Sequence, residues 1–98
     1  MKNKKKYWVG SLSAKKLILS VLMDLNFNYE EILIEARGNK IPKLLTVVEI
    51  LRRLTHDSLD VKISFNFIED ENVKNKNGLF FDKLLIPVAE ARLRKKLE

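Results

Sequence analysis

Basic residues gather in two short stretches of the chain, and their side chains have the chemistry that phosphate binding needs. The first stretch holds Lys15 and Lys16, and the second holds Arg37, Lys40 and Lys43. Lysine and arginine neutralise phosphates, and exposed helix N-terminal amides add favourable dipoles. If both stretches follow parallel strands, their loops meet at one edge of a sheet. We therefore interpret them as a candidate phosphate-binding rim; the alternative is an ordinary solvated rim.

The residue types that catalysis needs are scarce and scattered. The chain has no cysteine, which removes thiol catalysis, disulfides and thiolate zinc sites, and its single histidine, His56, follows a predicted helix, where capping accounts for it. The acidic run 69–71 lies on a predicted strand, where consecutive side chains point to alternating faces, so a solvated arm explains it better than a metal site. We expect no enzyme activity, no metal and no cofactor.

Composition narrows the partners of the chain. Its 98 residues, 46% of them hydrophobic, fit one domain with a core, and 19 Lys and Arg against 13 Asp and Glu leave a net charge of +6. That balance favours polyanions, either nucleic acid or an anionic membrane. No apolar stretch approaches the ~18 residues of a membrane span. We expect a cytoplasmic protein with a disordered basic tail at residues 1–6 and a single domain at residues 7–98.

Apolar spacing predicts the elements that position the basic residues. A helical period follows the good N-cap Ser13, and a second begins near Pro42, which suits a first helical turn. Strict alternation of apolar and polar residues begins at Val61. In chain order we expect a strand at 6–10, a helix at 14–25, a strand at 31–36, a helix from about 41 to 54, a strand at 61–67, an Asn-Gly turn at 74–78 and a returning strand within 79–93.

This order predicts an α+β fold, a two-layer β-α-β-α-β-β sandwich. A right-handed crossover makes the first two strands parallel and places both helices on one face of the sheet. The opposite face and a long final β-hairpin stay free. Pro87 interrupts the last strand, so that strand is bent, bulged or bordered by solvent there.

The segment 32–43, Ile-Leu-Ile-Glu-Ala-Arg-Gly-Asn-Lys-Ile-Pro-Lys, and its continuation at 46–52 resemble the archaeal Alba family. The predicted element order agrees with that family's fold, which is similar to the C-terminal domain of bacterial initiation factor three. The resemblance is strongest over residues 31–53. It implies a sequence-independent DNA- and RNA-binding protein of archaeal chromatin, nucleoid-associated, with a basic dimer body and two hairpin arms.

Two residues carry over from the family pattern, and two features depart from it. Arg37 matches the family's basic residue at the end of the second strand, and Lys43 matches the lysine that opens the second helix. The family's lysine pair after the first-strand glycine falls at Ser11 and Leu12 here, and the acidic run 69–71 lies near the arm. Because carboxylates repel phosphates, these departures weaken the expected binding. The weaker candidate contacts are Lys15, Lys16, Lys74 and Lys76.

The resulting expectation is a non-enzymatic dimer that binds the phosphate backbones of double-stranded DNA, RNA or both. We predict that the second helix and the final hairpin form the dimer interface. The helix residues in excess of one sheet-facing stripe are Val47, Ile50 and Leu54. Two alternatives stay open: an RNA-associated subunit resembling the Alba-like proteins of ribonuclease P, and a paralogue that forms heterodimers and modifies another Alba-like protein's assembly.

Overall fold

The computed structural model describes residues 3–70 and 84–96. Its elements follow the predicted β-α-β-α-β-β order, with one short 3-10 turn before the second helix. Their bounds are β1 (Lys4–Trp8), α1 (Ala14–Phe27), β2 (Glu31–Arg37), the 3-10 turn η1 (Gly38–Lys40), α2 (Ile41–Leu54), β3 (Leu59–Asp70) and β4 (Leu84–Lys95). Neither helix is long and apolar enough to cross a bilayer within these described ranges.

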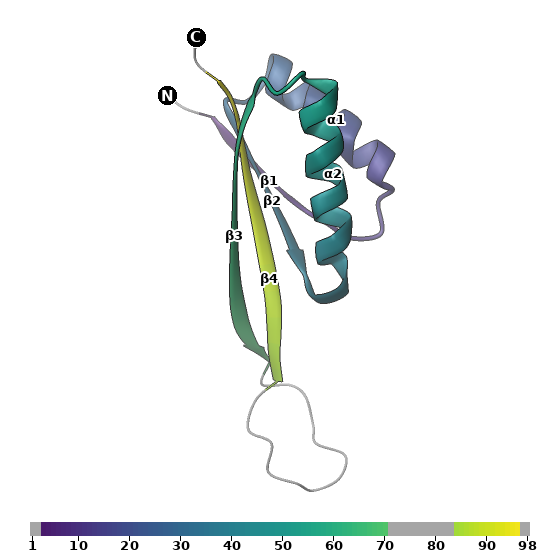
Figure 1. The fold of residues 1–98 in the computed structure, drawn as a ribbon, viewed down its shortest axis with the longest axis vertical. Coiled ribbons are helices and arrows are strands. Elements are labelled where there is room, and N and C mark those ends of the chain that lie inside the picture. Colours follow the sequence, from purple (N-terminus) through teal and green to yellow (C-terminus); the bar gives the residue numbers. More distant parts are fainter. Residues whose placement is uncertain (1–2, 71–83, 97–98) are drawn as a thin grey trace, which may run out of the picture.

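The four strands form one mixed sheet in the order β1-β2-β4-β3. β1 pairs parallel with β2, and β4 pairs antiparallel with both β2 and β3. Both helices cover the same face of this sheet (Figure 1). The predicted two-layer α+β fold with a final β3–β4 hairpin is therefore confirmed.

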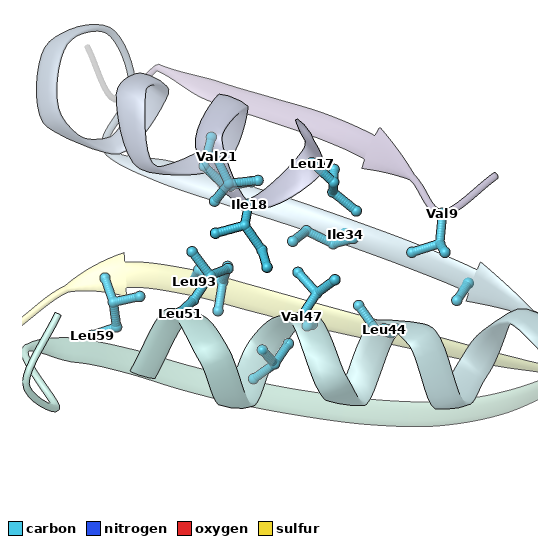
Figure 2. Packing of buried hydrophobic residues seen from close by; sticks show 14 of the residues in the cluster. Val9, Leu17, Ile18, Val21, Ile34, Leu44, Val47, Leu51, Leu59 and Leu93 are labelled. Carbon is cyan, nitrogen blue, oxygen red and sulfur yellow. The ribbon is translucent and has the colours of Figure 1, made fainter. Parts of the chain in front are cut away.

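The core lies between the helices and the middle of the sheet. α1 contributes Leu17, Ile18, Val21 and Leu25, and α2 contributes Leu44, Val47, Val48 and Leu51, both at the spacing of one helical face. The cross-strand pairs Ile32–Leu93 and Ile34–Ala91 meet these helices from the sheet, and Figure 2 shows Ile34 and Leu93 among the helix side chains. Burial of this continuous set fixes the position of the loops at the sheet edge.

The N-terminal lysines belong to the fold, which corrects the expected boundary of the basic tail. β1 begins at Lys4, two residues before the predicted strand start, and its three lysines each meet a carboxylate. Lys4 lies 3.1 Å from Glu31, Lys5 lies 3.1 Å from Asp24, and Lys6 lies 3.2 Å from Glu35. The sequence alone suggested a disordered tail because the carboxylates that pair with these lysines lie 19 or more positions farther along the chain.

The β3–β4 hairpin outreaches the rest of the sheet. β2 pairs with β4 only as far as Arg37–Val88, whereas β3 pairs with β4 through Asp70–Leu84. Pro87 lies just past the end of β2, where β4 has a neighbouring strand on one side only. Of the three alternatives predicted for this proline, a strand that is bent, bulged or bordered by solvent, the structure agrees with the last, because Pro87 is exposed and lies beyond the β2 pairing.

Candidate nucleic-acid interface

The two basic stretches meet at one edge of the sheet, as their positions after parallel strands predicted. The link is direct: the Lys43 ammonium donates hydrogen bonds to the carbonyl of Gly10 at 3.1 Å and to that of Leu12 at 2.6 Å. Lys43 opens α2, while both carbonyls belong to the loop between β1 and α1. The candidate rim is therefore one connected surface, defined here as the basic rim: Lys15, Lys16, Arg37, Lys40 and Lys43.

Lys43 makes backbone contacts that its sequence position did not predict. Its side chain is half-buried, and two of its three donors are used on backbone carbonyls. This lysine therefore fastens the β1–α1 loop to the start of α2. We interpret it as a positioning residue of the basic rim, and the predicted phosphate contact at Lys43 is restricted to the one remaining donor.

Arg37 ends β2 and faces solvent. Its Nε donates to Glu35 at 3.1 Å, which holds the guanidinium at the rim and leaves its terminal nitrogens available. The turn after Arg37 requires a glycine at the next position. Gly38 has a φ of +55°, a backbone conformation that residues with a side chain disfavour. Arg37 and Gly38 together thus place a forked cation at the edge of the sheet.

Three lysines complete the basic rim as open charges. Lys15 and Lys16 lie in the first turn of α1, whose N-cap Ser13 accepts a hydrogen bond from the Lys16 backbone at 3.2 Å, and Lys40 precedes α2. All three side chains are exposed, and none has a carboxylate partner within residues 3–70 and 84–96. These lysines are the members of the rim best able to meet a phosphate. Lys74 and Lys76, predicted as weaker contacts, lie outside the described residues, as does Glu71.

The face of the sheet opposite the helices carries charged side chains that sequence reasoning did not assign. We call it the outer face; it presents Lys4, Lys6 and Trp8 of β1, Glu31, Leu33, Glu35 and Arg37 of β2, Val88, Glu90, Arg92 and Arg94 of β4, and Asp60, Lys62, Ser64 and Asn66 of β3. Only the strand order reveals this set, because the side chains come from four separate segments. The sequence could have indicated which residues of each single strand share a face, because side chains alternate between the two faces of a sheet.

Two carboxylates of the outer face are buried beneath cations. Glu31 lies 3.1 Å from Lys4, 3.5 Å from Arg92 and 3.9 Å from Arg94; the Lys4 contact to Oε2 is an ion pair without hydrogen-bond geometry. Burial acts to raise the pKa of Glu35, but hydrogen bonds from Lys6 and Arg37 outweigh burial and lower it. Glu35 therefore stays ionised, and both glutamates hold the surrounding cations through short ion pairs.

A polar cluster on the helix side ties β1 to α1. The Tyr7 hydroxyl donates to Asp24, Lys5 lies 3.1 Å from the same carboxylate, and Asn28 donates to it at 3.2 Å. The Tyr7 hydrogen bond, with help from Lys5 and Asn28, lowers the pKa of Asp24, although burial opposes the shift. The Asn28 backbone N–H also donates to the Asp24 backbone carbonyl at 2.9 Å, in the last turn of α1, and the helix ends two residues past its predicted end.

The predicted dimer residues separate into buried and exposed positions. Val47 is 0% exposed and packs within the single chain, so it has no surface for a second copy, whereas Ile50 is half-buried and Leu54 is 55% exposed. The helical period alone could not separate these positions, because all three lie on one flank of α2. Further apolar side chains lie exposed on the helix-facing side of the hairpin: Ile63, Phe65, Phe67 and Leu85.

Comparisons with known proteins agree with this geometry. A sequence model of the Alba family matches residues 8–64. Among solved structures, Alba from Thermoplasma volcanium superposes with a TM-score of 0.66 at 22% sequence identity, covering 92% of this chain and 99% of that one. No curated protein sequence matches the chain. The matched segment spans β1's last residue through the middle of β3, and so contains the whole basic rim.

Proposed function

The chain belongs to the Alba family of nucleic-acid-binding proteins, and from that premise we propose that it binds the phosphate backbones of double-stranded DNA or RNA through the basic rim. Binding of this kind is independent of base sequence, because lysine and arginine contacts to phosphates carry no sequence information. The proposed setting is archaeal chromatin, with the protein associated with the nucleoid.

One observation carries this proposal: exposed cations converge at the loop edge of the sheet. Lys15, Lys16 and Lys40 have no carboxylate partner within the described residues, and Arg37 keeps its terminal nitrogens. Ser11 and Leu12 stand where the family has its lysine pair. Lys15 and Lys16 follow on the same loop and first helical turn, which Lys43 fastens to the rim. They supply the charge that the pair would otherwise provide.

We further propose that the protein acts as a dimer through the exposed apolar surface of the hairpin and α2. Phe65 and Phe67 are 65% and 63% exposed, and Leu54 is 55% exposed on the neighbouring helix. Large apolar side chains on one side of an arm favour burial against a second surface. Two-fold association of identical copies is the commonest way to bury them.

The absence of the lysine pair favours one alternative among those open from the sequence, a chain that acts mainly as a heterodimer partner of another Alba-like protein. Such a chain would offer the same dimer surface while its partner supplied most of the phosphate contacts. Weak duplex binding alone, together with strong binding after mixing with an Alba protein that retains the pair, would favour this alternative.

Charge reversal at the rim tests the proposal. We expect Lys15→Glu with Lys40→Glu to remove most affinity for a 20-base-pair duplex, because two open cations become repulsive. The matched control is Arg52→Glu with Lys95→Glu, which changes the net charge equally at positions outside the rim. Equal losses in both variants would mean diffuse attraction with no organised site. Circular dichroism verifies that both variants fold, since exposed charges contribute little to stability.

A further inference from the structure

The outer face of the sheet carries a second feature that the basic rim does not use, an exposed tryptophan that shares this face with lysine and arginine side chains. Trp8 is 61% exposed on the edge strand β1, and the Lys6 ammonium lies 5.1 Å from the centre of its ring. Truncation of a ring this exposed would cost the core little. An exposed aromatic ring on the open face of a sheet offers a surface on which a nucleic-acid base can stack.

Three of the six cations of the outer face lie in one row across the strands. The register places Lys6 beside Leu33, Leu33 beside Arg92, and Arg92 beside Lys62. Arg92 and Lys62 line a shallow hollow with Ser64 and Glu90. At ~4.8 Å per strand, this hollow lies roughly 10–14 Å from Trp8, a span that a short flexible segment can bridge.

The local charge balance favours an anionic ligand. Six basic side chains face four carboxylates on the described outer face, and Glu31 and Glu35 are buried beneath their cations. Lys62 is exposed and has no carboxylate partner in the part of the chain that the structure describes. Glu90 lies 3.9 Å from Lys6, which reduces its repulsion of an approaching phosphate.

We propose that the outer face binds a short unpaired segment of nucleic acid, with one base stacked on Trp8 and a phosphate farther along the same segment held by Arg92 and Lys62. This inference rests on the proposed nucleic-acid function and adds a second surface to it. An aromatic ring stacks on a base only where the face of that base is free, as in single strands, loops and bulges. Duplex backbones suit the basic rim, whereas the outer face suits unpaired bases.

Trp8 is the chain's single tryptophan, so its own fluorescence reports the proposed contact directly. The probes are a twelve-nucleotide oligothymidine, an oligouridine of equal length and a duplex DNA of mixed sequence. We expect the single strands to quench Trp8 fluorescence and the duplex to leave it nearly unchanged. Trp8→Ala should weaken single-strand binding about tenfold, because one stacked base is lost, and should leave duplex binding within twofold.

Two matched pairs separate this contact from general effects. Trp8→Phe keeps a stacking ring and should retain most single-strand affinity, whereas Phe27→Ala removes an exposed ring on α1 and should change nothing. Lys62→Gln should reduce the salt slope of single-strand binding by ~0.7, the value for one lost phosphate contact. Arg52→Gln, at an exposed position on α2, should leave that slope unchanged.

The outcomes distinguish this inference from the proposed function. One outcome would overturn the inference: the duplex binds, single strands do not quench Trp8, and Trp8→Ala binds single strands as tightly as the parent protein does. That outcome would leave the basic rim intact and point to a protein contact at Trp8. Single-strand quenching without duplex binding would support the outer face and refute the duplex function. Failure to bind either probe would refute both.

Discussion

Lys43 offers the sharpest test of how the basic rim is built, because the sequence predicts a phosphate contact there and the structure adds hydrogen bonds to two backbone carbonyls. Its ammonium donates to Gly10 at 3.1 Å and to Leu12 at 2.6 Å, and so fastens the loop between β1 and α1. Lys43→Met keeps the length and apolar stem of the side chain while it removes all three donors. Lys40→Met is the matched control, because Lys40 is exposed and has no such partner among the described residues.

The expected loss follows from the two hydrogen bonds. A bond from a charged donor contributes about 1.5–3 kcal/mol when it is desolvated. Since the Leu12 contact is exposed and water replaces it, we expect Lys43→Met to lose about 1–2 kcal/mol in total. For a domain of this size each kcal/mol corresponds to roughly 4–8 °C in melting temperature. Lys40→Met should stay within about 0.5 kcal/mol of the parent.

Duplex binding across a salt series separates positioning from direct contact. Loss of one phosphate contact reduces the log–log salt slope by about 0.9, so Lys40→Met should show this reduction. Lys43→Met should weaken binding several-fold with an unchanged slope, because the loop loses its position while the number of phosphate contacts is kept. A reduced slope in Lys43→Met, with an unchanged melting temperature, would refute the loop-fastening role and make Lys43 a direct ligand.

Three further predictions concern stability and assembly. Hydrogen bonding lowers the pKa of Asp24 in the folded state. The stabilisation by this carboxylate is therefore full above the unfolded pKa of about 3.9 and is lost as the pH falls through the folded pKa. We expect the difference in free energy of unfolding between the parent and Asp24→Asn, measured by urea unfolding, to shrink below about pH 4. His56 has a φ of 53°, so His56→Gly should raise the free energy of unfolding by about 0.5 kcal/mol, and a loss would show that its side chain has a role beyond the turn. Phe65→Ser with Phe67→Ser should convert a sedimenting dimer to a folded monomer, while Phe27→Ser should not; a persistent dimer would remove the hairpin from the interface.

Periodicity predicted best the elements whose apolar residues all pack into the core. β2 is a continuous buried run and α2 has a regular apolar stripe, so the observed bounds agree with the predicted ones within about one residue. β1 was placed less well, because its inner and outer residues include three lysines. The carboxylate partners of these lysines come from β2 and α1, and the sequence of residues 4–6 does not predict those ion pairs.

The candidate site was predictable in composition but only partly in geometry. The meeting of the two basic loops follows from parallel strands with loops at one edge, and sequence alone supports it. The use of Lys43 on carbonyls depends on the distance between α2 and the β1–α1 loop, which packing of the helices determines. The outer face depends on strand order, because Trp8 and Lys62 lie 54 positions apart and share a surface only in the assembled sheet.

Duplex binding by the parent protein across a salt series tests the central claim most directly. With about three to five phosphate contacts per duplex site, the affinity should fall with salt on a log–log plot with a slope of roughly −3 to −5, for DNA and RNA alike and without preference for any base sequence. Absence of duplex binding by micromolar protein at low salt, or a slope near zero, would contradict a phosphate-binding rim.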